Sequence, residues 1–269
     1  VNLENSNLTG NVEVVISYPI VFYSNGYFMT KLGDSSTYIS GITDLKTMVE
    51  YMEDGSTLIF CETFNVVGNI VIDSGDKRVT FTRYVDFKSR GDTKPMIAIN
   101  GTSATVKNQL TLRGKIFVDG MAPFSGIWNF TGGEANELVS NVKWYAVFEV
   151  GKSTSASETG GSLTLESGVV VRNWNLKIDA KNVGLITIHS GGTVKLDGCE
   201  IYANRILDKN QNSSVITNSG TLTIASGVFM NNVITSGASY EGNRGQFNDI
   251  FGKGGFLFCN TGSVTTISG

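Results

Sequence analysis

Glu166 and Asp197 are the pair of residues whose types and spacing best suit acid–base chemistry in this chain. Each lies five residues after the opening glycine of a pattern that recurs in the second half of the sequence. Two neighbouring carboxylates can hydrolyse a glycosidic bond or share a cation, and Lys195 and Arg172 lie nearby in sequence. The equivalent residue of the third copy is Ala225, which favours a solvent-exposed turn. We therefore treat Glu166 and Asp197 as weak metal-site candidates and predict no catalytic residue.

The other reactive side chains form no known catalytic or metal-binding motif. His189 is the only histidine, and a lone histidine before a turn is typical of a surface position. Cys61, Cys199 and Cys259 are far apart in sequence, so we expect buried, unpaired thiols and neither a disulfide framework nor a CxxC metal site. No phosphate-binding loop, HExxH or GxSxG motif occurs. The sequence therefore predicts no metal and no cofactor.

Aromatic side chains gather in the longest stretch that lacks strand-like patterning, near residues 120–145. Trp128, Phe130, Trp144 and Tyr145 lie there and are suited to stacking on sugar rings. The more ordinary role of such residues is to pack an insertion against the rest of the fold. The four aromatic residues are therefore the candidate ligand-binding site, with packing as the alternative.

The elements that position these residues follow from a thirteen-residue repeat. Its copies read GSLTLESGVVVRN (161–173), GTVKLDGCEIYAN (192–204) and GTLTIASGVFMNN (220–232), and a fourth copy begins at Gly262. Within each copy apolar and polar residues alternate, which indicates a half-buried strand; a turn and a second short strand follow. A third apolar run precedes each opening glycine. Three short strands per repeat predict an all-β fold, the right-handed parallel β-helix, and nothing in the repeat has a helical period.

Each copy ends in an asparagine at the same distance from its opening glycine. Asparagine tolerates the left-handed backbone conformation that a turn requires. Because stacked strands lie about 4.8 Å apart, amide side chains at equivalent positions can hydrogen-bond to one another along the stack. We therefore predict a structural ladder of Asn173, Asn204 and Asn232.

The N-terminal part of the chain predicts two elements that precede the regular repeats. Residues 1–42 are expected to form a β segment with a hairpin around the Ser-Asn-Gly at 24–26. Residues 43–54 have the pattern of a short amphipathic helix, with Thr43 as its cap and Gly55 as its stop. We expect this helix to cover the open end of the β-helix.

The β-helix is expected over residues 43–269, with insertions near 120–145 and 233–255. The repeat spacing is uneven because the segment after each asparagine varies in length. The insertions should therefore emerge from one edge of the fold, where repeat proteins often place binding functions.

Composition and charge exclude some partners. The chain has 21 Lys and Arg against 24 Asp and Glu, a net charge of −3, and a pI near 5.3. A nucleic-acid-binding protein would carry a basic stripe, so we expect no nucleic-acid partner. No apolar run reaches the roughly 18 residues needed to cross a bilayer, so we expect no membrane insertion.

Over roughly residues 43–269 the chain resembles the right-handed parallel β-helix surface proteins of bacteria, a pectate-lyase-like fold family that includes adhesins. The resemblance rests on a helix followed by DGSTLIF (54–60), and on coils of the form SGTLTIASGVFMNN (219–232). The FMNN at 229–232 also looks like the FxxN element of chlamydial-type polymorphic surface proteins, although the other two copies lack its phenylalanine. The resemblance implies an extracellular, cell-surface protein, and it specifies architecture more strongly than function.

We therefore expect a non-enzymatic extracellular structural or adhesive surface protein. Its expected partners are host or surface glycans, or copies of itself. The last repeat stops at Gly269 without a capping unit, so we expect either a longer stalk or a second subunit that completes the coil. The second case would make a head-to-tail fibre. The alternative function is that of a polysaccharide lyase or glycoside hydrolase of the same fold.

Overall fold

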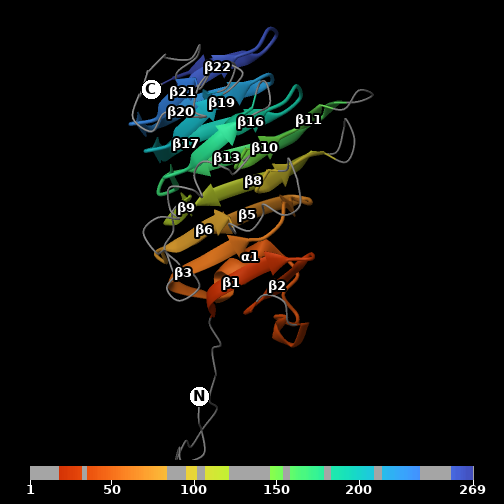
Figure 1. Cartoon of the computed structure of the whole chain (residues 1–269). Helices are drawn as coiled ribbons and strands as arrows, with labels where there is room; N and C mark the ends of the chain where they lie inside the picture. Colours follow the sequence, from red (N-terminus) through yellow and green to blue (C-terminus); the bar gives the residue numbers. More distant parts are fainter. Residues whose placement is uncertain are drawn as a thin grey trace, which may run out of the picture.

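A computed structural model describes residues 18–31, 35–83, 95–101, 107–120, 146–153, 158–178, 183–208, 214–236 and 256–268. These residues are mostly β-strand, with a single α-helix near the N-terminal end of the described chain. The strands form an elongated stack that rises from β1 at the N-terminal end to β22 and β23 at the C-terminal end (Figure 1). The expectation of a mostly β protein built on parallel sheets is confirmed.

Most strands belong to one large sheet. Its twelve members are β1 (Tyr18–Ser24), β2 (Tyr27–Met29), β3 (Met52–Phe60), β5 (Asn69–Asp73), β6 (Val79–Arg83), β8 (Asn108–Arg113), β9 (Ile116–Asp119), β13 (Gly161–Glu166), β14 (Val170–Arg172), β17 (Thr193–Tyr202), β20 (Thr221–Met230) and β23 (Val264–Ile267). Neighbouring strands pair in parallel, except that β2 is antiparallel to β1.

Two further parallel sheets run beside the large one. The six-stranded sheet contains β4 (Phe64–Asn65), β7 (Ile97–Ile99), β10 (Phe148–Val150), β16 (Gly184–Ile188), β19 (Ser214–Asn218) and β22 (Leu257–Cys259). The three-stranded sheet contains β15 (Asn175–Ile178), β18 (Arg205–Asp208) and β21 (Val233–Ser236). A short antiparallel pair, β11 (Lys152–Ser153) and β12 (Glu158–Thr159), and a 3-10 turn (Ser35–Thr37) complete the described elements.

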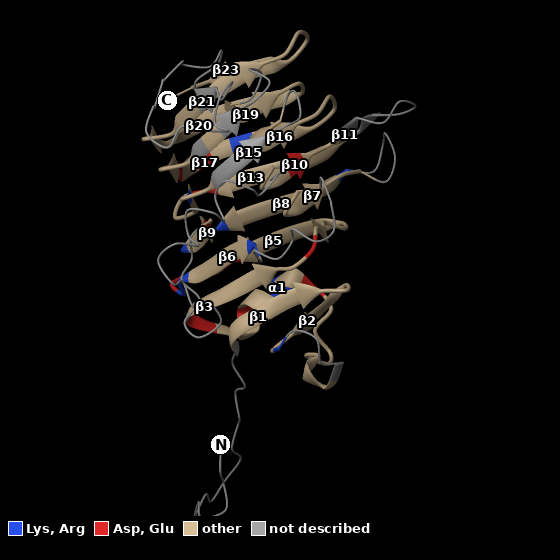
Figure 2. Ribbon diagram, in the orientation of Figure 1, with Lys and Arg blue, Asp and Glu red and all other residues tan. Residues whose placement is uncertain are grey.

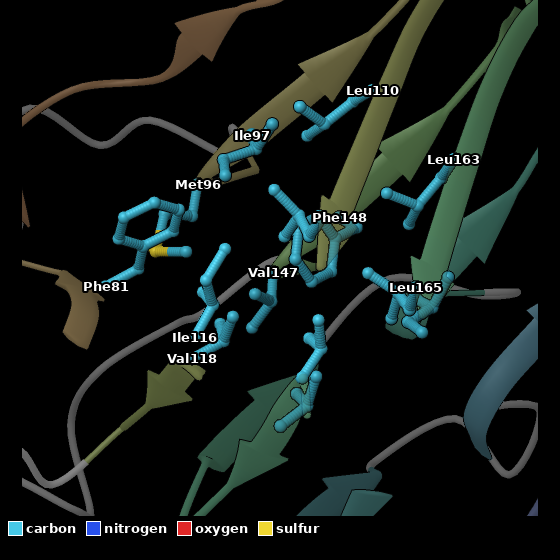
Figure 3. Close-up of a cluster of buried hydrophobic side chains, with 14 of the residues drawn as sticks. Phe81, Met96, Ile97, Leu110, Ile116, Val118, Val147, Phe148, Leu163 and Leu165 are labelled. Atoms are coloured by element: carbon cyan, nitrogen blue, oxygen red, sulfur yellow. The ribbon is translucent and has the colours of Figure 1, made fainter. Parts of the chain in front are cut away.

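The core lies between the large sheet and the six-stranded sheet. Apolar residues of successive repeats pair directly with one another, so they form columns along the stack. One column consists, in order, of Ile72, Leu112, Leu165, Leu196, Ile224 and Ile267. Figure 3 shows Leu110 and Leu163 of the large sheet facing Ile97 and Phe148 of the smaller one. Burial of these columns is the main source of stability, because each buried Leu or Ile contributes about 1.5–3 kcal/mol.

The predicted turn within each repeat is present only in the first copy. There β13 and β14 are separate strands. In the next two copies β17 and β20 run on as ten-residue strands, and the predicted turn is replaced by a register shift around Asp197–Cys199. Gly198 takes a φ of +89° at this point, a conformation that favours glycine, so the strand bulges without ending.

The segments after the asparagines are not simple insertions. Each begins with a further strand: β15, β18 and β21 follow the three repeat copies and pair in parallel, residue for residue. The predicted insertion over 233–255 is therefore wrong for its first four residues, which form β21. Its remainder and residues 121–145 lie outside the described residues.

The N-terminal hairpin is present, with Asn25 and Gly26 both at positive φ, as a tight two-residue turn requires. The predicted helix is α1 (Leu45–Tyr51), shorter than residues 43–54. Its cap is Asp44 and not Thr43, because the carboxylate of Asp44 accepts hydrogen bonds from the backbone and hydroxyl of Thr47 at 2.8 Å.

The end of α1 was also predicted wrongly. The helix passes directly into β3 at Met52, before it reaches Gly55. The ammonium group of Lys77 donates to the carbonyl oxygens of Val49, Glu50 and Met52 at 2.9–3.2 Å. A side chain from a later turn of the chain thus satisfies the helix end, and not the predicted stop at Gly55. Leu45, Met48 and Val49 are buried, and α1 packs against β5.

Candidate functional site

Glu166 and Asp197 occupy neighbouring positions on adjacent strands of the large sheet. Glu166 pairs with Asp197 and Gly198 where β13 meets the bulge of β17, as the repeat register predicted. Arg113 lies on the other side of Glu166, because Leu112 pairs with Leu165. Asp73 pairs with Arg113 in turn. These four residues form a row of charges across four strands, which we call the acidic–basic row.

Most members of the acidic–basic row are held in ion pairs. Arg113 Nε donates to Asp73 Oδ2 at 2.8 Å, and Lys195 Nζ lies 2.6 Å from Asp197 Oδ2. A backbone hydrogen bond from Gly75, followed by the bond and charge of Arg113, lowers the pKa of Asp73. The hydrogen bond to Asp197 and then its charge raise the pKa of Lys195.

Solvent exposure sets what this row can do chemically. The side chains of the Asp73–Arg113 and Lys195–Asp197 pairs are between 39% and 48% exposed. Water screens such charges, so the row lacks the water-excluded surroundings that give fixed charges catalytic strength. Within the described residues, no group of three His, Cys, Asp or Glu side chains is placed to hold a metal ion.

His189 has an acidic neighbour that the sequence did not reveal. Its Nε2 lies 3.8 Å from Glu149 Oε2, which is too long for a direct hydrogen bond. Glu149 is in β10 and His189 follows β16, which pairs with β10, so the contact joins two layers of the six-stranded sheet. The two side chains are 27% and 23% exposed. Parallel stacking brings them together across a large sequence separation, so no local motif could have shown the pair.

The asparagine ladder exists, but with one member different from the prediction. Asn204 Nδ2 donates to Asn232 Oδ1 at 2.9 Å, the contact that the repeat predicted for these two residues. The prediction for Asn173 is wrong. Its amide donates to both carboxylate oxygens of Asp119 and not to Asn204.

Trp174 takes the place in the column that we had assigned to Asn173. Arg172 pairs with Tyr202, and Tyr202 with Met230, so the residue two positions further on is Trp174, Asn204 and Asn232 in the three layers. The backbone N–H of Trp174 donates to Asn204 Oδ1 at 3.1 Å. We call Trp174, Asn204 and Asn232 the polar column.

The three members of the polar column make the same contact with the layer beneath them. The amide groups of Asn204 and Asn232 donate to the carbonyl oxygens of Val171 and Ile201, which pair with each other in the sheet. The indole N–H of Trp174 donates to the carbonyl oxygen of Val118 at 3.0 Å, the partner of Val171 in the layer below. An indole thus replaces an amide as donor to an equivalent acceptor.

A second polar cluster lies just outside the column. Asp119 is 5% exposed, and Arg172 Nε donates to its Oδ2 at 2.7 Å. Arg172 also donates to Tyr202 Oη at 3.1 Å, and this bond, ahead of the contact with Asp119, raises the pKa of the guanidinium group. The guanidinium groups of Arg172 and Arg78 both lie over the Phe117 ring, 5.1 and 4.8 Å from its centre. These contacts join successive layers, as the polar column does.

The remaining sequence candidates have mixed outcomes. Cys199 is buried as expected, and burial raises the pKa of its thiol to about 12. The prediction is wrong for Cys259, which is exposed, and Cys61 is only partly buried. None of the three cysteines forms a disulfide. The aromatic candidates Trp128, Phe130, Trp144 and Tyr145 lie outside the described residues.

Comparison with known proteins assigns no family to the chain. No family model, curated protein or solved structure matches it. Among the described helices, none has the length and apolar character needed to cross a bilayer.

Proposed function

We propose that the chain forms a right-handed parallel β-helix and acts as a non-enzymatic structural or adhesive protein at the cell surface, outside the cell. The path of the chain supports the fold: β16, β17 and β18 follow one another, and each pairs in parallel with its counterpart among β19, β20 and β21. One circuit of about 30 residues per layer is the organisation of a solenoid.

The polar column is the observation that carries the functional part of the proposal. Its buried polar groups all bond to the neighbouring layer, so their role is to fix one layer on the next. The titratable groups that suit chemistry, by contrast, are half-exposed members of ion pairs. A stack whose layers are joined by the polar column suits a stalk or a display scaffold better than a catalyst.

The adhesive form of the proposal places glycan binding on the aromatic residues near 120–145. The test is binding to immobilised surface glycans by the whole chain and by Trp128→Ala and Trp144→Ala variants. We expect binding that weakens at least tenfold in both variants. Tyr51→Ala is the control, because Tyr51 is an exposed aromatic residue at the end of α1, outside this part of the sequence. Equal weakening in the control, or no binding by the parent chain, would contradict glycan adhesion.

The alternative is a polysaccharide lyase or glycoside hydrolase, favoured by the adjacency of Glu166 and Asp197. A screen against polyuronides and neutral polysaccharides tests it, with Glu166→Gln and Asp197→Asn as variants. Asp76→Asn is the control, since Asp76 carries a fully exposed carboxylate in another ion pair. We expect no cleavage by the parent chain. Cleavage that disappears in the two variants and survives in the control would replace our proposal with the enzymatic one.

The head-to-tail fibre is the less supported form of self-association. It requires the C-terminal layer of one copy to pair with the N-terminal end of the next. That end is already covered: α1 packs beneath β5, and Tyr38 bridges to Met29 at the outer side of β2. Electron microscopy of concentrated protein would reveal filaments if this form existed.

A further inference from the structure

Two tyrosine rings stack on each other beside the first strands of the large sheet. The ring centres of Tyr27 and Tyr38 are 5.0 Å apart, and the planes of the rings differ by 13°. The two residues are 55% and 40% exposed. Among the described residues, no other two tyrosine rings are in contact. The two phenols are thus held face to face at a place that solvent reaches.

The backbone sets the positions of both rings. Tyr27 begins β2, and Tyr38 lies opposite Met29 in an antiparallel bridge. The hydrogen bonds that flank this bridge make it a non-hydrogen-bonded pair, the kind in which opposite residues lie closest. Tyr27 is the diagonal neighbour of Tyr38, a position from which aromatic side chains reach each other. The stack therefore follows from strand pairing and does not depend on a chance surface rotamer.

The same bridge covers the outer side of an edge strand. β2 pairs with β1 on one side, and its other side contacts only this segment among the described residues. Neither strand contains a charged residue, and Figure 2 draws both in tan. Charges, and lysine above all, are the usual protection of an exposed edge. Here two backbone hydrogen bonds of 3.0 Å provide the cover: Thr30 N donates to Thr37 O, and Ile39 N donates to Phe28 O.

We propose that Tyr27 and Tyr38 are a site of oxidative cross-linking, at which a haem peroxidase and hydrogen peroxide join the two rings by a carbon–carbon bond. The oxidised haem takes one electron and one proton from each phenol hydroxyl, which leaves two tyrosyl radicals. A bond then forms between one ring carbon beside each hydroxyl group. The protons on these two carbons pass through water to the phenol oxygens, so both rings become aromatic again. The chain loses two hydrogen atoms, and one hydrogen peroxide is reduced to two waters.

The stacked geometry favours coupling within one chain over coupling between chains. Two reactants held in contact react in a unimolecular step, whose effective molarity is far above any protein concentration. Both rings are about half-exposed, so an oxidant reaches them. Exposed side chains also change rotamer within nanoseconds, which lets the rings turn from the stack into bonding contact. The link would tie the covering segment covalently to β2. The proposal goes beyond the surface function and does not depend on glycan binding.

The sequence makes the cross-linked product easy to identify. Lys31 lies between the two tyrosines, so trypsin separates them unless they are linked. Tryptic peptide 32–46 contains Tyr38 as its only tyrosine, and peptide 1–31 contains Tyr18, Tyr23 and Tyr27. The test treats the whole chain with a haem peroxidase and one equivalent of hydrogen peroxide. We expect dityrosine fluorescence, a mass lower by two hydrogen atoms, and these two peptides joined.

Tyr27→Phe and Tyr38→Phe are the test variants, because phenylalanine keeps the stacked ring and has no hydroxyl hydrogen to lose. Each should reduce the yield of the joined peptides at least tenfold. Tyr51→Phe is the matched control, since it removes a phenol of comparable exposure, and it should leave the yield unchanged. The fraction of chains that are linked should not depend on protein concentration. The proposal would be overturned by a parent chain that yields no joined peptides, by joining that survives Tyr27→Phe, or by products that are mainly covalent dimers.

Discussion

Replacing Asn204 with alanine should cost far more stability than a typical substitution at a turn. The side chain is 1% exposed and makes three hydrogen bonds: it accepts from Trp174 N at 3.1 Å and donates to Val171 O at 3.2 Å and to Asn232 Oδ1 at 2.9 Å. Each bond contributes about 1 kcal/mol net, and the partners that stay buried without a replacement raise the cost. We expect a loss of ~3–4 kcal/mol, equivalent to a fall in melting temperature of about 10 °C.

Urea unfolding of the parent and variant chains measures this loss, with the slope of each transition checked for two-state behaviour. Asn231→Ala is the matched control. Asn231 is exposed, and its φ of 53° is shared by Ala203 at the equivalent position of the preceding layer, so alanine is accommodated there. We expect the control to lose less than about 1 kcal/mol. Equal losses in the two variants would refute the claim that the polar column holds the layers together.

Three further predictions follow from the contacts described above. Lys77→Met removes three hydrogen bonds from the end of α1, so it should lower the free energy of unfolding in urea by ~1–3 kcal/mol. Lys115→Met removes only an exposed ion pair and should change this free energy by less than about 0.5 kcal/mol. Equal effects of the two substitutions would argue against the capping role of Lys77. Hydrogen bonds lower the pKa of Asp73 in the folded chain. The stability that they contribute is therefore present above the pKa of the unfolded chain and is lost as the pH falls through the pKa of the folded chain. Asp73→Asn should show a smaller loss of melting temperature than the parent on acidification below about pH 4, and an unchanged acid response would contradict this. In thiol labelling at pH 8, exposed Cys259 should react in the folded protein. Buried Cys199, whose pKa is about 12, should react only when the protein unfolds. Early labelling of Cys199 would show that the interior is open to solvent.

The repeat period predicted the strands well, and it failed where local geometry changes the residue count. The three asparagines have equal spacing in sequence, yet Asn173 lies outside the column. Ser162 of the first copy pairs with Thr193 of the second, and Val171 pairs with Ile201. Between these two pairs, the first copy contains one residue more than the second. That extra residue lies in the turn that the later copies replace with a bulge. Counting along the chain cannot reveal such a shift, because the bulge depends on pairing with the next layer.

The sequence also could not show that Trp174 is the third member of the polar column. An indole and a carboxamide look unrelated, but both offer an N–H donor to the carbonyl of the layer below. The strand at the start of each insertion was missed, although the sequence carries a signal for it. β15, β18 and β21 read NLKI, RILD and VITS, and their β-branched and apolar residues carry a signal that the uneven spacing obscured.

The repeat predicted where the candidate charged residues lie, but not the ion pairs that they form. Equal offsets correctly placed Glu166 beside Asp197. The ion pair of Asp197 with Lys195 on the same strand, and that of Asp73 with Arg113 on adjacent strands, depend on side-chain direction as well as on register. The contact between His189 and Glu149 was missed because the two residues belong to different layers, whose alignment the sequence period does not fix in the degenerate half of the chain.

Parallel layering has a mechanical consequence for a protein anchored at one end and pulled at the other. Tension along the stack acts across the strands, so it strains the inter-strand hydrogen bonds of a layer one after another and peels the layers from the end. Each layer released would lengthen the tether by about 100 Å, since roughly 30 residues become extended. The protein would then yield in similar steps under load, as an extensible link and not as a stiff rod.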